Sequence, residues 1–355
     1  MEYFFNNILE NGCIRASPST DPDYNFHWIR DSAIVIKSIT SLYEEDREND
    51  KYKTIIEKYI DTEIQHIQYH PAEPKFLLDK TPYTGDWGRP QNDGPALRGL
   101  ICLKLLKLFP KKSGALLKII KNDLSYTIDE IEQPCFDLWE EEFGYHLYTR
   151  MVQTKFLHEC FKNHKTHIEK LTQDVLNRAN ELLSHHFSEN KIHSSYSLNG
   201  GILREYDSSF FLGLCHVDYD LPGISIYDNR IINYCYNMKN HFYEIYEINK
   251  NKKIPFFGRY LNDKYFNGNP WIICTISFFH YLLKVEKLTY HKEEFFNFVK
   301  FLLEKKMDLP EQIQRDTGNN ISVERLTWNY SEIILFLKSL KKIDSVNLFS
   351  TFFTF

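Results

Sequence analysis

The sequence lacks several signatures that would assign it to a broad class of protein. It contains no apolar run of the roughly 18 residues that a membrane-spanning helix needs. Its first residues, MEYFFNNILENG, have neither a basic start nor a sustained apolar stretch, so we expect no signal peptide and an intracellular location, cytoplasmic or vacuolar. With 43 basic and 48 acidic side chains and no basic stripe, we expect neither nucleic acid nor a membrane as a partner.

Paired cysteines are also missing. The seven cysteines are odd in number and scattered, and none of them forms a Cys-x-x-Cys pair. This argues against a disulfide framework and against a structural zinc site, and it favours reduced thiols inside the cell.

No Pro/Gly/Ser-rich linker and no low-complexity run divides the 355 residues. Because 43% of the residues are hydrophobic, the chain has enough apolar material for one large core. We therefore predict a single domain spanning residues 1–355, and we expect a monomer.

What the sequence does have is five tryptophans in unusually polar segments. Trp28, Trp87, Trp139, Trp271 and Trp328 lie in WIRD, DWGRPQNDGP, DLWEEE, NGNPW and LTWNY, beside carboxylates, arginines or amides. An indole next to acids and a guanidinium suits a sugar, because the ring covers the apolar face of a pyranose while the polar neighbours bind its hydroxyls. We predict that these segments line one site.

The polar segments recur roughly every 50–60 residues, with LREYDSSFF around Asp207 filling the longest gap, so the chain divides into six units. Each segment precedes a run that is apolar nearly all round, which is typical of a buried helix. These runs are residues 33–42, 96–109, 145–157, 209–217, 271–283 and 330–337.

Between the buried runs lie segments with a one-sided apolar stripe, which is typical of half-exposed helices. They cover residues 55–67, 116–128, 168–183, 226–242 and 295–307. This alternation predicts an all-α fold, an (α/α)6 double barrel with six inner and about six outer helices. The first outer helix is abbreviated to about residues 3–9. Asn269 and Pro270 are expected to start one inner helix, and Asn92 to Pro95 another.

In DLWEEE, the spacing of Asp137, Glu140 and Glu141 would place three carboxylates on one face if the segment is helical. Their mutual repulsion would help to keep one of them protonated, as a general acid requires. Taken alone, such a triplet is more typical of a solvated helix start. Glu311, taken alone, would be an ordinary loop residue, and Arg30 with Asp31 could equally be a structural ion pair.

Read together, these motifs resemble those of the glucoamylases, glycoside hydrolase family 15. The resemblance rests on DWGRPQNDGPALR, on the DLWEEEFGYHLYTRMVQ stretch, on GRYLNDKYFNGNPW and on PEQIQRDTGNNISVERLTWNY, and it spans residues 16–333 in family order. It implies the same barrel and an inverting exo-hydrolase that releases β-glucose from the non-reducing ends of α-1,4-glucans such as glycogen, soluble starch or maltooligosaccharides.

The resemblance further implies roles for individual residues. Glu140 would be the general acid and Glu311 the general base. The substrate-binding residues would be Tyr24, Trp28, Arg30, Asp31, Trp87, Asp137, Trp139, Glu141, Arg259 and Trp328, whereas Trp271 is as consistent with a framework role. A two-carboxylate mechanism requires no metal and no cofactor.

The chain also departs from the family pattern. The first helix is clipped, no linker leads to a starch-binding module, and the stretch from Trp271 to Glu311 is short, which would alter the outer rim. The resemblance leaves open a related α-glucosidase acting on trehalose or α-1,6 dextrins. A carbohydrate-sensing module without turnover is a further alternative, although such modules tend to lose a catalytic carboxylate. A helical barrel of isoprenoid chemistry would need Asp-rich metal motifs that are missing.

Overall fold

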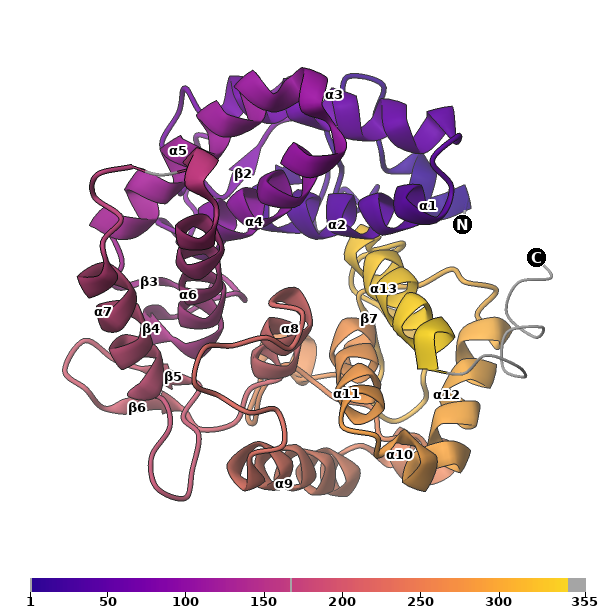
Figure 1. The fold of residues 1–355 in the computed structure, drawn as a ribbon. Helices are drawn as coiled ribbons and strands as arrows, with labels where there is room; N and C mark the ends of the chain where they lie inside the picture. Colours follow the sequence, from indigo (N-terminus) through magenta and orange to yellow (C-terminus); the bar gives the residue numbers. More distant parts are fainter. Residues whose placement is uncertain (1, 167, 344–355) are drawn as a thin grey trace.

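The computed structural model describes residues 2–166 and 168–343. Six helices form an inner ring: α2 (Ile29–Glu45), α4 (Asp93–Leu108), α6 (Leu147–Lys162), α8 (Ser209–His216), α11 (Ile272–Lys284) and α13 (Thr327–Ile343). Each packs on the next, and α13 packs back on α2, so the ring is closed (Figure 1). The predicted end of the domain at residue 355 lies outside the described residues.

The inner helices are apolar on every side because both of their faces are covered. In α11, for example, every residue from Ile272 to Leu283 is buried. The outer helices are α3 (Asp50–His66), α5 (Ser113–Asp129), α7 (Gln173–Ser184), α9 (Asn229–Ile245) and α12 (Lys292–Glu304). Each of these buries a single stripe; in α9 it consists of Ile231, Tyr234, Cys235, Met238 and Phe242.

The predicted (α/α)6 double barrel is therefore confirmed. The abbreviated first outer helix corresponds to α1 (Glu2–Asn6), five residues long, which contacts α13 and buries Phe4. A further short helix, α10 (Glu247–Lys252), follows α9. None of the helices in the described part of the chain is long and apolar enough to cross a membrane.

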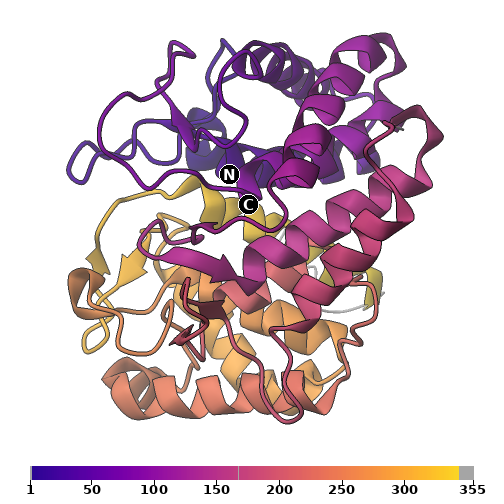
Figure 2. The same cartoon turned by 90° about the vertical axis from the view of Figure 1, so that its left-hand side faces the viewer.

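Short antiparallel strands, which the sequence patterns did not indicate, connect the helices at one end of the ring. Strand β1 (His27–Trp28) pairs with β2 (Lys75–Phe76), and β7 (Gln312–Ile313) pairs with β8 (Asn320–Ile321). A four-stranded sheet contains β3 (Cys135–Phe136), β4 (Phe143–His146), β5 (Ser195–Tyr196) and β6 (Ile202–Arg204), in that order. Figure 2 shows the barrel from the side that carries this four-stranded sheet.

Several predicted helix starts differ from the observed ones, among them those of α11 and α7. Helix α11 begins at Ile272, and the residue before it is Trp271, so the expected start at Asn269 and Pro270 is wrong. The Asn269 amide instead donates to the Phe266 carbonyl, which holds the preceding turn. Helix α7 begins at Gln173, after an N-cap at Thr172, and not at residue 168.

Candidate active site

One cavity of about 580 Å3 opens where the segments before the inner helices meet. This gathering confirms that five of the six polar segments share one mouth of the barrel. The predicted site residues that line it are Tyr24, Trp28, Arg30, Asp31, Trp87, Trp139, Glu140, Glu141, Arg259, Glu311 and Trp328. Trp271 also lines the cavity, whereas Asp137 and Asp207 do not.

The segment 137–142 forms the loop of the β3–β4 hairpin, so the expected helical face is wrong. The Asp137 N–H donates to the Glu142 carbonyl at 3.0 Å, and the Glu140 N–H donates to the Asp137 carbonyl at 3.0 Å. Glu140 itself has a φ of +67°, a left-handed conformation that ends any helical run. The Asp137 carboxylate accepts the N–H groups of Glu141 and Glu142, and thereby fixes the loop.

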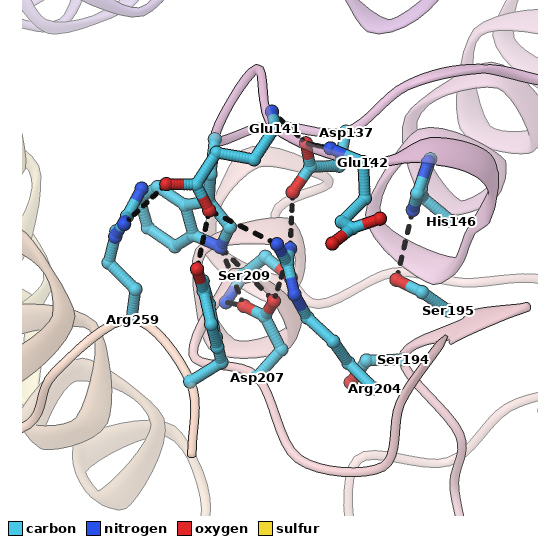
Figure 3. A network of polar contacts seen from close by, with 12 residues as sticks. Asp137, Glu141, Glu142, His146, Ser194, Ser195, Arg204, Asp207, Ser209 and Arg259 are labelled. Atoms are coloured by element: carbon cyan, nitrogen blue, oxygen red, sulfur yellow. Dashed lines mark hydrogen bonds and ion pairs between the residues drawn. The ribbon is translucent and has the colours of Figure 1, made fainter. Parts of the chain in front are cut away.

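Asp137 is paired with a cation and does not crowd Glu140. Its carboxylate accepts a hydrogen bond from Arg204, at the end of β6 (Figure 3). Burial alone would raise the pKa of Asp137, but Arg204, His146 and the loop N–H groups hold it below its ordinary value. Asp137 therefore acts on the loop that carries Glu140, at a distance from the cavity.

Glu141 is the second carboxylate in this network. It accepts a hydrogen bond from Arg259 at 2.7 Å and another from Arg204 at 3.2 Å, and the Tyr260 hydroxyl donates to its second oxygen (Figure 3). Arg259 is held in turn by Asp263 at 2.7 Å. These contacts set the orientation of two cavity-lining side chains, Glu141 and Arg259.

Glu140 accepts four hydrogen bonds from side chains that converge on it from separate segments. Oε1 accepts from the indole N–H of Trp28 at 2.8 Å, from Gln91 at 3.0 Å and from Arg30 at 3.2 Å. Oε2 accepts from the indole N–H of Trp87 at 2.8 Å. Sequence reasoning missed Gln91, although it stands in the DWGRPQNDGP motif itself.

Glu311 lies in a drier environment, with only 1% of its surface exposed. It directly precedes β7, and its N–H donates to the Val323 carbonyl at 2.8 Å. Burial raises its pKa, against the opposing effect of donors from Ser322, Gln312 and Tyr24. Ser322 and Gln312 both donate to Oε2, at 2.5 and 3.0 Å.

Arg30 and Asp31 form one buried end of the cavity. Arg30 donates to Asp93 at 3.1 Å and to Gln91 at 3.0 Å, while its Nε lies 3.4 Å from the Asp31 Oδ2. Burial raises the pKa of Asp31 to about 7, opposed by Arg30. Asp31 Oδ2 and Arg30 Nε are buried without a hydrogen-bond partner. Buried polar atoms of this kind are costly unless a ligand satisfies them.

Aromatic rings cover much of the cavity wall. Trp28 and Trp87 pack edge-to-face at 6.2 Å, and Trp139 packs on Trp271 at 5.4 Å. The Trp139 indole N–H is fixed by Asp207 at 2.9 Å, so the sixth polar segment supports the wall from behind. The indole N–H of Trp271 is buried without a partner.

Lys75, on β2, is a site residue that the sequence patterns did not indicate. Its ammonium lies over the rings of Trp87, Tyr83, Phe26 and Trp28, between 3.2 and 4.9 Å from the centroids. Burial lowers the pKa of Lys75 to about 8, opposed by Glu140. The caged cation fixes the two indoles that donate to Glu140.

One group among the described residues has atoms close enough together to hold a metal ion: His27, Glu63 and His66. The Ile14 N–H donates to Nδ1 of His27 at 2.8 Å, so the proton of this ring is on Nε2, which donates to Glu63 at 3.0 Å. A protonated nitrogen cannot ligate a metal. Glu63 also accepts from Arg98 at 3.0 Å, and the group is a hydrogen-bonded brace behind β1.

Comparison with known proteins identifies the family. A family model described as "Glycosyl hydrolases family 15" matches residues 6–287. The probable glucoamylase of Schizosaccharomyces pombe is 28% identical, over 94% of this chain and 88% of that protein. The intracellular sporulation-specific glucoamylase of Saccharomyces cerevisiae is 30% identical, over 78% of this chain and 60% of that protein. The chain also spans only 53% and 64% of two other fungal glucoamylases that it matches.

The fold agrees with this relationship. The glucoamylase from Saccharomycopsis fibuligera superposes with a TM-score of 0.82, at 22% identity, covering 96% of this chain and 93% of that one. Sequence and fold thus lead to the same family along most of the chain. The chain belongs to family 15 of the glycosyl hydrolases.

Proposed function

We propose that the protein is an inverting exo-hydrolase that releases β-D-glucose from the non-reducing ends of α-1,4-glucans. The observation that carries this proposal is that Glu140 and Glu311 line one cavity, each oriented by its own set of donors. Two carboxylates on either side of a sugar are the machinery of glycoside hydrolysis, and inversion requires room for water between them.

In this mechanism Glu140 protonates the glycosidic oxygen as the bond to the anomeric carbon breaks. The N–H groups of Trp28, Trp87, Gln91 and Arg30 stabilise the charge left on the Glu140 carboxylate. These donors are in place before the reaction, so no reorganisation is needed as the charge develops.

Glu311 acts on the opposite face as the general base. It takes a proton from a water molecule whose oxygen attacks the anomeric carbon, which inverts the configuration and gives β-glucose. Since burial makes Glu311 more basic, it accepts the proton more readily. Ser322 and Gln312 both hold its Oε2, and Tyr24 is a further donor to the carboxylate.

The remaining lining residues would bind the sugar. Arg30 and Asp31, with unsatisfied buried atoms, would bind hydroxyls of the terminal glucose and close the pocket, which makes cleavage exo. Arg259 would hold the glucose at the cleavage point, while Glu141 would contact the glucose on the leaving side. The sugar faces would lie against Tyr24, Trp28, Trp87, Trp139 and Trp328. In place of the direct role expected for Asp137, we propose that it positions the loop.

An intracellular site of action is supported by the cysteines. All seven are buried free thiols, and burial raises the pKa of Cys135 to about 12 and of Cys13 to about 11. Such thiols do not depend on an oxidising compartment. The monomeric state and the absence of a required metal or cofactor stay predictions.

Glucose release and its stereochemistry test this proposal. NMR of a fresh maltoheptaose hydrolysate should show β-glucose first, with α-glucose appearing only through mutarotation. An initial α-anomer would contradict inversion. A panel of maltose, trehalose, isomaltose and glycogen tests the substrate, since the cavity defines the terminal glucose better than the leaving side. A preference for trehalose or isomaltose would replace the α-1,4 assignment.

A further inference from the structure

One buried arginine of the described chain has no carboxylate partner. The buried arginines are Arg30, Arg98, Arg150, Arg204 and Arg259, and four of them form ion pairs with buried or half-buried acids. Arg150 is 4% exposed, and its only hydrogen bond joins Nη1 to the Gln153 amide oxygen over 3.4 Å. Because a buried charge is costly unless it is paired, Arg150 has more to gain from an anion than the four arginines that already have one.

The Arg150 side chain lines a second cavity, of about 450 Å3, on the outer side of the barrel. This cavity lies between the start of α6, helix α7 and the turn that joins β5 to β6; Figure 1 shows these elements together, and Figure 2 faces them. It shares no lining residue with the cavity that contains Glu140 and Glu311. Its volume is within the range of small-molecule sites.

The lining of this second cavity contains two guanidiniums and one carboxylate among the described residues. Arg178, on α7, is the other guanidinium in its lining, and it is matched by Glu132 at 2.8 Å and by Glu181 at 2.8 Å. Glu132 is the only acid of the lining among the described residues, and it is already engaged with Arg178. Arg150 is therefore the guanidinium of this lining that binds no carboxylate directly, with Glu132 acting on it only from a distance, and its remaining N–H donors suit an anion.

Two tyrosines give the cavity a surface suited to a sugar ring. Tyr145 on β4 and Tyr196 on β5 are directly opposed in the strand register, so their side chains lie on the same face of the sheet. The Arg150 guanidinium lies 5.7 Å from the Tyr145 ring centroid. Leu182 and Leu198 add apolar surface, and Ser197 adds a hydroxyl. Aromatic and apolar walls beside one cation fit a ligand with a flat face and a single charged end.

We propose that this cavity binds a phosphate group, free or carried on a glucose unit, through the planar fork of Arg150. Arginine binds phosphate oxygens through two parallel N–H donors, and a dianion gains most from a guanidinium whose donors no carboxylate occupies. The Tyr145 and Tyr196 rings then cover the sugar that carries the phosphate. The second site goes beyond the hydrolase activity and does not depend on it.

Thermal unfolding of the full chain with three probes tests this proposal. Inorganic phosphate should raise Tm saturably, by about 2 °C or more at saturation, whereas sodium chloride of equal ionic strength should not; glucose, which can enter the cavity of Glu140 and Glu311, gives the baseline for glucose 1-phosphate. The part of the glucose 1-phosphate shift that Arg150→Met removes belongs to this cavity: if it exceeds the phosphate shift the ligand is a phosphorylated sugar, and if it equals the phosphate shift the ligand is the phosphate group alone. No phosphate shift beyond that of chloride would overturn the proposal.

Two matched variants separate binding from a structural role. Arg150→Met should abolish the phosphate shift and leave the unliganded Tm equal to or above that of the wild type, since an unpaired buried charge is removed. Arg98→Met is the control: Arg98 is equally buried but paired with Glu63 and Asp123, so its loss should lower Tm strongly. An Arg150→Met protein as unstable as Arg98→Met would show that Arg150 is structural and would contradict the proposal.

A variant at the rim gives an independent check. Leu198 is 60% exposed and lines the cavity, so Leu198→Glu should leave the fold intact while its carboxylate competes with the anion. Leu198→Gln is the uncharged control and should keep the shift. If Leu198→Glu binds phosphate as the wild type does, the anion lies elsewhere. Glucose release from maltoheptaose should be unchanged in the Leu198 and Arg150 variants.

Discussion

Glu140 and Glu311 face the same cavity from opposite surroundings. Glu140 lies in a hairpin loop, keeps 14% of its side chain exposed, and accepts N–H donors on both oxygens. Glu311 is 1% exposed, and Ser322 and Gln312 both donate to the same oxygen of its carboxylate. Under the proposed mechanism, the surroundings of Glu140 suit a group that is left with a charge after it gives up a proton, and those of Glu311 suit a group that takes one up. The proposal thus assigns opposite roles to two identical groups on the basis of their environments.

The largest effect should follow from removing the proton that Glu140 supplies. Glu140→Gln should lower kcat on maltose by about 10³–10⁴-fold, because the amide fills the same space without an acidic proton. Maltose binding, measured by calorimetry, should persist. The neighbouring Glu142→Gln is the control, since Glu142 lies on the same loop outside the cavity lining. Unchanged turnover in Glu140→Gln would remove Glu140 as the acid.

Changing Glu311 should be nearly as severe. Glu311→Gln should lower kcat on maltose by about 10²–10⁴-fold, since no group remains to take a proton from water. The unfolding free energy should fall little, because burying a charged carboxylate costs more free energy than burying a neutral amide of the same shape. Activity within tenfold of the wild type would exclude a general-base role.

A smaller effect is expected for the loop that positions Glu140. Asp137→Asn keeps the shape of the side chain but weakens the contact with Arg204, leaving that buried guanidinium less well matched. The unfolding free energy should fall by about 1–3 kcal/mol. Because the loop carries Glu140, kcat should fall by a larger factor than KM changes. Urea unfolding and maltose kinetics measure both quantities. A change confined to KM would instead support direct sugar binding by Asp137.

The cage around Lys75 tests whether the donors of Glu140 need support. Lys75→Met should lower kcat/KM by about tenfold, because Trp28 and Trp87 lose the cation between them. The folded-state pKa of about 8 is below the ordinary 10.5, so the unfolded chain binds more protons in this window. The free energy of unfolding of the wild type should therefore increase as the pH rises from 8 to 10.5. Lys75→Met should lack this increase, because it has no group to titrate at this position. If the unfolding free energies of both proteins depended on pH in the same way, Lys75 would not be enclosed by these rings.

The smallest effect concerns the base alone. Ser322 donates to the Glu311 carboxylate and lowers its pKa, so Ser322→Ala should raise the pKa of Glu311 further. Since the base must be ionised, the acid limb of the kcat/KM profile should move to higher pH, by up to about 1 unit. An alkaline limb that moves instead would mean that the two carboxylates have been assigned the wrong way round.

The barrel could be predicted because its pattern is encoded locally. Helices that are apolar all round alternate with one-sided helices, and this periodicity depends only on which faces are covered. The strands were missed because they are two to four residues long, too short for an alternating pattern to register. The start of α11 was misplaced because Asn269 and Pro270, which are typical of helix starts, serve the turn before it.

The sequence predicted most of the residues that line the site, but not how they are arranged. The motifs identified Glu140 and Glu311, but the helical spacing in DLWEEE suggested a shared carboxylate face that the left-handed Glu140 does not allow. Lys75 could not be found from its sequence surroundings, because Phe26, Tyr83 and Trp87 approach it only through the fold. Gln91 was visible in its motif, yet only the structure shows its contact with Glu140.

The central claim, that Glu140 supplies a proton and Glu311 removes one, is tested most directly with α-glucosyl fluoride. Fluoride leaves without protonation, so hydrolysis of this substrate needs the base but not the acid. Glu140→Gln should hydrolyse α-glucosyl fluoride at a rate within about tenfold of the wild type while failing on maltose, and Glu311→Gln should fail on both. Equal loss on both substrates in Glu140→Gln, or retained fluoride release in Glu311→Gln, would contradict the account.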